Sequence, residues 1–450
     1  MDARTTEALA WPDAEMVEAF VIDVNGVPRG KWIPRDRVQD LQVKGVALPR
    51  SIYALDIWGR DVDEAGLAIG TGDPDGICLP VAGTIGLVPW LGRPTAQVML
   101  SMVEADGSPF YGDPRQVLAG VLRRYEAAGL RPVVAVELEF YLIDQHRSAT
   151  DPLRPPNSRK GRWHGWQTQV LSIAELHAAE PILSDIFRAC AAQNIPADTA
   201  VRENGPSQYE INLRHVDDAL VAADHAAMLK RAVKGIARQH GLDATFMAKP
   251  YGDCAGNGMH VHMSILGKDG GNIFVGSGEQ PADALRHAVG GMLTHMADSM
   301  LLFAPHCNSY RRLRPGAHAP TRASWGYDNR TAAVRVVTAP RAATRIEHRV
   351  AGGDANPYLV LAAILAAALD GIEAGLEPGA PMQGESGIAE YEKLPINWDE
   401  AIGRFERSDF IRDALGAEYR HLYAATKQQE QAEFRLRVTD VEFDAYLMTV

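Results

Sequence analysis

The sequence has few cysteines, and they lack the spacings that cysteine chemistry requires. Four cysteines occur among 450 residues, and no two of them form a CxxC pair. We therefore expect neither a disulfide framework nor a structural zinc site, and a reducing cytoplasm suits this composition. The four residues are Cys78, Cys190, Cys254 and Cys307.

Basic blocks and long apolar runs are also scarce. The formal net charge is -12 without a basic stripe, so nucleic acid is not an expected partner. The N-terminus lacks a basic region followed by an apolar one, so we predict no signal peptide. The longest apolar run, 358–369, is too short to cross a bilayer and is typical of a buried helix. We therefore predict a cytoplasmic globular enzyme without a membrane partner.

The length and the local patterns indicate two domains. Residues 15–108 are strand-like and turn-rich, with a hairpin signal at Asn25-Gly26, and a hydrophilic connector at 104–109 marks the boundary. Beyond it, Asp113-Pro114 begins a helix that Gly129 ends. Further helices are predicted near 174–193, 217–240, 281–302 and 356–374. The predicted fold class is α+β, with a small β-rich domain before a large second domain at 109–450.

Four predicted strands of the second domain carry polar side chains at every second position, and alternate residues of a strand share one face. Glu137 and Glu139 share a face in the first strand, and Glu210 lies in the second, shortly after Glu203. The third strand, at 259–265, places two imidazoles and a hydroxyl on one face. In the fourth, two arginines flank a glutamate. The residues of these last two strands are His260, His262, Ser264, Arg345, Glu347 and Arg349.

Each strand by itself has an ordinary explanation. Half-exposed antiparallel strands alternate because solvent covers their polar side, and arginine–glutamate stripes usually form cross-strand ion pairs. Together, however, five glutamates and a histidine suit hard divalent ions such as Mg²⁺ or Mn²⁺. Nearby arginines would balance the negative charge of a phosphorylated substrate. The combination predicts phosphoryl transfer, although no P-loop or kinase signature is present. These arginines are Arg312, Arg330, Arg335, Arg345 and Arg349.

Longer motifs resemble the glutamine synthetase family over nearly the whole chain, from about 20 to 447. The most specific are Lys249-Pro250 followed by 256–264, the Glu137-x-Glu139 pair and 345–349. Residues 308–313, 329–330 and 355–359 fit as well. The hairpin at 24–31 and the segments 418–421 and 427–434 resemble the γ-glutamylpolyamine (γ-glutamylputrescine) synthetase branch.

The resemblance implies a fold and a set of site residues. The fold is a β-grasp-like domain at 15–108 and a catalytic domain at 109–450 with a curved antiparallel sheet flanked by helices. The cofactors implied are ATP and two or three Mg²⁺ or Mn²⁺ ions. One metal would be held by Glu139, Glu203 and Glu210, and the other by Glu137, His260 and Glu347. ATP would contact His262, Ser264, Arg335 and Arg345. Glutamate would lie at Asn257, Gly258, Arg312 and Arg349, with Glu139 and His260 beside it, and Arg330 would stabilise the transferred phosphate.

The resemblance implies an ATP-dependent ligase that joins the γ-carboxylate of glutamate to an amine through γ-glutamyl phosphate. The ammonium site departs from true glutamine synthetases, because His318 stands where they have a glutamate, and Asp56 is a weakly aligned candidate for their ammonium-binding aspartate. We therefore expect putrescine or another polyamine as acceptor, with His318 as a base. Three alternatives stay open: ammonia, a small monoamine (methylamine, isopropylamine or ethanolamine), or a non-catalytic relative. The family's dodecamer of two hexameric rings implies a homo-oligomer with active sites between subunits, which would bring Asp56 and Arg60 in from a neighbour.

Overall fold

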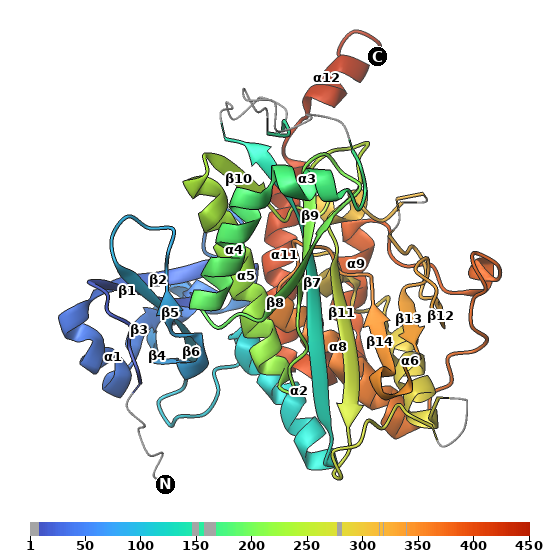
Figure 1. Cartoon of the computed structure of the whole chain (residues 1–450), viewed down its shortest axis with the longest axis horizontal. Helices are drawn as coiled ribbons and strands as arrows, with labels where there is room; N and C mark the ends of the chain where they lie inside the picture. The colour runs from blue at the N-terminus through green and yellow to red at the C-terminus, as the bar shows by residue number, and fades with distance from the viewer. Residues whose placement is uncertain are drawn as a thin grey trace.

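The computed structural model describes residues 9–145, 153–156, 168–276, 281–314, 316–317, 319–338 and 340–450. Its first sheet, drawn in blue in Figure 1, has the strand order β2-β1-β6-β4-β3, with β5 paired to β6. The pair β1–β6 is parallel and the other pairs are antiparallel. The strands are β1 (Met16–Ile22), β2 (Pro28–Pro34), β3 (Val46–Pro49), β4 (Asp75–Pro80), β5 (Gly86–Leu87) and β6 (Thr95–Val103).

The predicted hairpin at Asn25-Gly26 is confirmed. Strands β1 and β2 pair in antiparallel register from Met16–Pro34 to Ile22–Pro28. Gly26 has a φ of 75°, a left-handed conformation that glycine adopts without steric cost. The tip of the hairpin meets the C-terminal half of the chain, because the Asn25 amide donates to Glu430 Oε1 at 3.0 Å.

The second sheet has the order β12-β13-β14-β11-β7-β9-β8, with β10 paired to β7. It is antiparallel as predicted except for the parallel pair β12–β13 at one edge. The long strand β7 alternates buried apolar residues with partly exposed polar ones, so one face is packed and the other carries the charged groups. The strands are β7 (Arg131–Asp144), β8 (Ala197–Arg202), β9 (Gln208–Leu213), β10 (Leu242–Thr245), β11 (Met259–Leu266), β12 (Trp325–Tyr327), β13 (Val334–Val337) and β14 (Arg345–His348).

Helices cover the packed face of this sheet and fill the C-terminal region (Figure 1). Helix α2 begins and ends as predicted, because the Asp113 side chain accepts from Arg115 N and Gly129 is left-handed. The helices are α1 (Val38–Lys44), α2 (Pro114–Ala128), α3 (Ile173–Ala178), α4 (Glu180–Ala192), α5 (Ala219–Gln239), α6 (Asp283–His295), α7 (Met300–Phe303), α8 (Pro357–Ala374), α9 (Trp398–Arg407), α10 (Asp409–Leu415), α11 (Ala417–Arg435) and α12 (Asp440–Tyr446).

Two predicted helices are each divided in the structure. The one expected near 174–193 is interrupted at Ala179, two residues before Pro181 in the first turn of α4, because proline has no N–H to continue a helix. The one expected near 281–302 ends at His295 and resumes as α7. The predicted domain boundary at 108/109 falls between β6 and α2, and the exact division stays a prediction.

Helix α8 forms the core of the second domain. It is the one helix among the described residues that is long and apolar enough to cross a membrane, yet 78% of that window is buried inside the protein. Its first residues also contact the hairpin, since the amide of Asn356 donates to Asp23 O at 2.9 Å. The apolar run at 358–369 is therefore a buried helix, as predicted.

Candidate active site on the central sheet

The polar faces predicted for separate strands become one surface through the strand register. Glu139 of β7 lies opposite Glu210 of β9, and Glu137 lies opposite His260 of β11. His262 lies opposite Glu347 of β14. Directly opposed residues on a shared face have Cβ atoms about 5 Å apart, so glutamate and histidine side chains at such positions reach one another. We call this group the carboxylate–histidine cluster: Glu137, Glu139, Glu210, His260, His262 and Glu347.

Glu137 is at the centre of this cluster. Its Oε1 is 2.9 Å from His262 Nε2, and its Oε2 is 3.3 Å from His260 Nδ1. The side-chain amide of Asn212 donates to Oε1 at 2.9 Å. His260 Nδ1 also lies 4.0 Å from Glu347 Oε1. One carboxylate thus links both histidines, and through His260 it approaches a second carboxylate.

The pKa values of the glutamates are shifted in opposite directions, upward by burial and like charges and downward by the histidines. Burial raises the pKa of Glu203 to about 7, with Glu139 adding repulsion. Burial, and then Glu137 and Glu139, raises the pKa of Glu210 above its usual range. Burial acts against the charge of Glu137 too, but hydrogen bonds from the two histidines outweigh it and lower that pKa. This side of the sheet therefore has more carboxylates than the surrounding cations stabilise.

The donor set of the cluster fits a divalent metal. In two groups, one ligand atom from each member lies within 4.8 Å of the others: Glu137, His262 and Glu347, and Glu137, Glu210 and His260. Carboxylate oxygen with imidazole nitrogen suits Mg²⁺ or Mn²⁺. Glu137 belongs to both groups, whereas the resemblance places it at one metal only. Within the described part of the chain, Glu139 and Glu203 belong to neither group.

Glu139 contacts the segment predicted to hold glutamate. Its Oε2 accepts from Gly258 N at 2.7 Å and from the Gln208 amide at 3.4 Å. A side chain at Gly258 would put its Cβ 2.9 Å from Arg312 Nη2 and 3.0 Å from His260 Nε2, so a larger residue would require these side chains to shift. Arg312 is buried, and its Nη1 donates to Val350 O at 2.7 Å.

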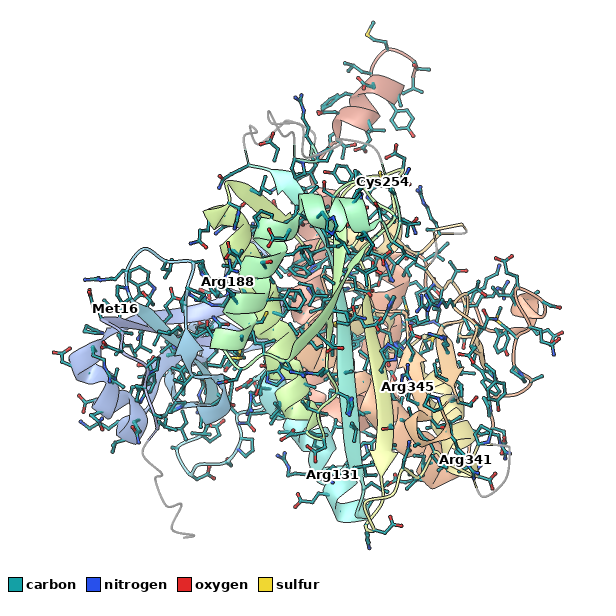
Figure 2. The ribbon with its side chains drawn as sticks, viewed as in Figure 1. Met16, Arg131, Arg188, Cys254, Arg341 and Arg345 are labelled. Carbon is teal, nitrogen blue, oxygen red and sulfur yellow. The ribbon has the colours of Figure 1, made fainter. Side chains whose placement is uncertain are left out.

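Three of the predicted arginines border the cluster. Arg335 Nη1 is 2.9 Å from Glu347 Oε2, and Arg349 pairs with the other oxygen of Glu347. Burial raises the pKa of Glu347, but Arg349, His260 and His262 together outweigh it and the net pKa is lowered. Arg345, labelled in Figure 2, donates through Nε to His262 Nδ1 at 3.2 Å. Ser264 follows on the same strand and is partly buried.

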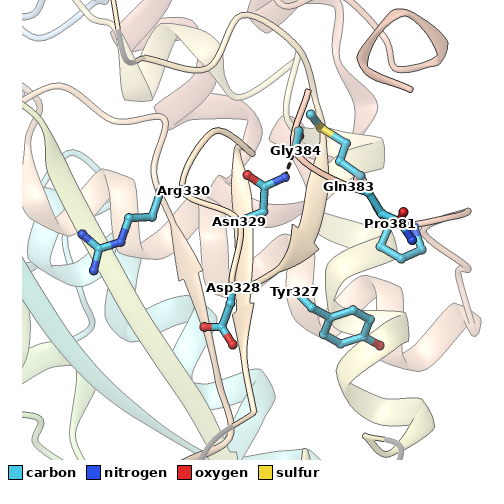
Figure 3. Close-up of a pocket in the computed structure, with 8 residues that line it drawn as sticks. Tyr327, Asp328, Asn329, Arg330, Pro381, Gln383 and Gly384 are labelled. Carbon is cyan, nitrogen blue, oxygen red and sulfur yellow. Dashed lines mark hydrogen bonds between the residues drawn. The ribbon is translucent and has the colours of Figure 1, made fainter. Parts of the chain in front are cut away.

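Other predicted residues lie apart from these contacts. Arg330 is exposed in the turn between β12 and β13, where it lines a pocket of about 530 Å³. Figure 3 shows its side chain directed away from Asn329, whose amide donates to Gly384 O at 2.8 Å. Asp56 is buried and accepts from Arg60 Nε at 2.8 Å and from the Gln429 amide at 3.0 Å. His318 lies outside the described residues.

Gln208 and Asn212 share the polar face of β9 with Glu210, and the sequence by itself predicted no role for them. The structure shows both amides bonded to cluster glutamates, Glu139 and Glu137 respectively. Their period-two spacing with Glu210 was the available signal. Sequence reasoning missed the buried pair Lys427–Glu430, which has a nitrogen–oxygen distance of 3.0 Å. Only its spacing of three residues along a helix hinted at it.

Comparison with known proteins gives a family profile and close relatives. The profile described as "Glutamine synthetase, catalytic domain" matches residues 111–446. The chain is 42% identical to the γ-glutamylputrescine synthetase PuuA of Escherichia coli strain K12 over 96% of this chain and 92% of that protein. It is 36% identical to the γ-glutamylethanolamide synthetase GlnA4 of Streptomyces coelicolor over 87% of this chain and 80% of that protein.

A solved structure is similar over nearly the whole length. It is titled "GmaS/ADP complex-Conformation 1", with a TM-score of 0.82 and 29% sequence identity. The match covers 96% of this chain and 97% of that one. Both sheets and the helices between them therefore share the arrangement of that protein.

Proposed function

The chain belongs to the glutamine synthetase family, and from that premise we propose that it is an ATP-dependent ligase joining the γ-carboxylate of glutamate to putrescine or another polyamine. The observation that carries the reaction type is the carboxylate–histidine cluster, which places metal-binding donors beside several arginines on one sheet face. The acceptor is inferred from the 42% identity to the γ-glutamylputrescine synthetase.

Each residue has a proposed role that follows from its position. The residues that would hold the divalent ions are Glu137, Glu139, Glu203, Glu210, His260 and Glu347. Such ions, when bound, neutralise charge on phosphate oxygens. Arg335 and Arg345, with His262 and Ser264, would orient ATP. Arg330 would stabilise the transferred phosphoryl group. Asn257, Gly258, Arg312 and Arg349 would position glutamate.

The reaction has two balanced steps. An oxygen of the glutamate γ-carboxylate attacks the γ-phosphorus of ATP, the bond from that phosphorus to the bridging oxygen breaks, and ADP leaves. The amine nitrogen then attacks the acyl carbon, the carbon–oxygen bond to phosphate breaks, and the amine loses a proton. Activation is needed because a carboxylate is a poor electrophile. Arginines at fixed positions lower the cost of charge that develops on the phosphoryl group.

Metal binding should depend on pH. Glu203, with a pKa of about 7 in the absence of metal, must lose its proton before its carboxylate can act as a ligand. We expect the affinity for Mn²⁺, measured by isothermal titration calorimetry, to rise from about pH 6 to about pH 8, with protons released on binding from both Glu203 and Glu210. Glu203→Gln should remove part of this slope. An affinity independent of pH over that range would contradict the role of Glu203.

An amine panel tests the proposed acceptor. Phosphate release and the mass of the amide product would be measured with putrescine, ammonium, methylamine, isopropylamine and ethanolamine. We expect kcat/KM for putrescine to exceed that for ammonium by about a hundredfold or more, because a site built for a long diamine loses contacts with a small cation.

Each alternative gives a distinct result in the same panel. Turnover on ammonium with none on alkylamines would make the chain a true glutamine synthetase. Preference for a monoamine would place it with the ligases for small amines. No phosphate release with any acceptor would indicate a non-catalytic relative.

The proposals for assembly and location rest on the exposed apolar residues of α12 and on the free cysteines. Helix α12 projects from the body (Figure 1), and Val441, Phe443 and Leu447 are 75%, 49% and 66% exposed. An apolar tail of this kind supports a homo-oligomer, and we propose the dodecamer of two hexameric rings, whose mass analytical ultracentrifugation would measure. All four cysteines are free, which agrees with a proposed cytoplasmic location.

A further inference from the structure

A second cavity lies between the hairpin of the first sheet and helix α5. Its volume is about 380 Å³, within the range of about 300–1,000 Å³ that is usual for small-ligand sites. The hairpin loop at 25–28 and Trp90 line one side, and the segment 245–247 lines another. Helix α5 contributes four cations, Lys230, Arg231, Lys234 and Arg238.

Two of these four cations already have carboxylate partners. Arg231 pairs with Glu18, and Arg238 Nε lies 3.3 Å from Asp243 Oδ1. Among the described residues, no carboxylate lies within 4.0 Å of the ammonium group of Lys230 or Lys234. Lys230 donates to the carbonyl of Ala355 at 3.0 Å. Two lysines one helical turn apart thus face the cavity with unpaired charge.

The remaining groups around the two lysines offset this charge only in part. Both ammonium nitrogens lie over the ring of Phe246, at 5.5 Å for Lys230 and 5.9 Å for Lys234. Asp354 is the one carboxylate lining the cavity, and its Oδ2 already accepts from Ser309. Burial, with repulsion from Lys234, lowers the pKa of Lys230 to about 7. An anion in the cavity would stabilise the buried ammonium group of Lys230 and reduce its repulsion with Lys234.

We propose that this cavity binds a small anion with two or more negative charges, at a site separate from the carboxylate–histidine cluster. Lysine binds phosphate and carboxylate as a point charge, so phosphorylated compounds and dicarboxylates share the chemistry that the two ammonium groups recognise. The Phe246 and Trp90 rings, with the hairpin backbone, would enclose the rest of the ligand.

The cavity is joined to the cluster by hydrogen bonds. The Asn257 amide donates to Thr245 O at 3.2 Å and to Met247 O at 2.9 Å, and both residues line the cavity. Asn257 Oδ1 accepts from the Gln208 amide at 3.1 Å, and that amide also contacts Glu139. A ligand that shifts the segment 245–247 would therefore shift Asn257, which the proposed function places at glutamate.

Direct binding tests the site independently of any activity. The probes are pyrophosphate and succinate, titrated calorimetrically into the full chain, into Lys234→Gln and into a control, Lys44→Gln. Lys234 makes no hydrogen bond or ion pair among the described residues, so its replacement should not affect folding. Lys44 is 73% exposed on α1 and provides the same change of charge elsewhere.

We expect at least one probe to bind the wild type and the control equally, and Lys234→Gln about tenfold more weakly. Binding of neither probe, or equal binding by Lys234→Gln, would overturn the site. The two probes distinguish a preference for phosphate from one for carboxylate.

The coupling to Asn257 rests on the proposed function and has its own readout. The probe that binds should change the KM for glutamate in the wild type and in Lys44→Gln by severalfold, but not in Lys234→Gln. An unchanged KM in the presence of a bound probe would overturn the coupling and leave the binding site standing. A wild type without ligase activity would count against the proposed function instead. The calorimetric test of the binding site does not depend on activity.

Discussion

Replacing Glu137 by glutamine is expected to lower kcat by about a thousandfold or more without unfolding the protein. Glu137 contacts His260 and His262 and belongs to both candidate metal groups. The amide keeps an oxygen that can accept from Asn212 but loses the negative charge, so both groups would hold a divalent ion less tightly. Several kcal/mol of transition-state stabilisation depend on such ions, and about 4 kcal/mol corresponds to about a thousandfold in rate.

The matched control is Glu126→Gln, on the exposed side of α2. It carries the same chemical change outside the site, so its kcat and thermal midpoint should equal those of the wild type. Phosphate release gives kcat, circular dichroism reports the fold, and calorimetry with Mn²⁺ gives the metal affinity. A Glu137→Gln protein with kcat within about threefold of the wild type would contradict the assignment of this residue.

Replacing Lys427 by methionine is expected to destabilise the chain by about 3–5 kcal/mol, the usual cost of breaking a buried ion pair. Lys427 and Glu430 have fully buried side chains, and Lys427 Nζ lies 3.0 Å from Glu430 Oε2. Glu430 Oε1 also accepts from the Asn25 amide and from Ile57 N. The variant would leave a buried carboxylate without its lysine where both halves of the chain meet, with His306 Nδ1 at 3.8 Å from Glu430 Oε2 as the remaining partner.

A double variant distinguishes the cost of breaking the ion pair from the cost of losing the packing of the Lys427 side chain. Lys427→Met with Glu430→Gln removes both charges and keeps an oxygen that can accept from Asn25 and Ile57, so it should recover much of the stability that the single variant loses. Chemical denaturation of the full chain gives both free energies of unfolding. If the single variant were as stable as the wild type, the pair would not hold the junction.

The same pair predicts a dependence on pH. Burial opposes the charge of Glu430, but Lys427 and His306 together outweigh it and lower the pKa from 4.5 to about 2. A carboxyl with a depressed folded-state pKa stabilises the fold fully above its unfolded pKa and loses this contribution as the pH falls through its folded pKa. The cost of Lys427→Met should therefore be largest near neutral pH and should shrink as the pH falls from about 4.5 to about 2.

The sequence predicted the elements that obey local rules. The hairpin at Asn25-Gly26 and the ends of α2 follow from turn and capping preferences, which a few neighbouring residues decide. The period-two pattern likewise put Glu137 and Glu139 on one face of their strand. The family motifs named the same residues that the register of the sheet brings together.

Other features depend on which segments meet in space, so no local pattern predicts them. The partners of Glu137 follow from the register of β7 with β9 and β11, which fixes the distances to Asn212, His260 and His262. The break after His295 divides a helix whose apolar pattern runs on.

The sequence by itself thus determined the chemistry available on each strand, because side-chain type and alternation are local properties. Only the tertiary structure decided how those faces combine. It made Glu137 common to both ligand groups, buried Lys427 with Glu430 at the junction, and turned two unpaired lysines of α5 toward a cavity. Each of these depends on contacts between residues distant in the chain, where burial and neighbouring charge set the energies.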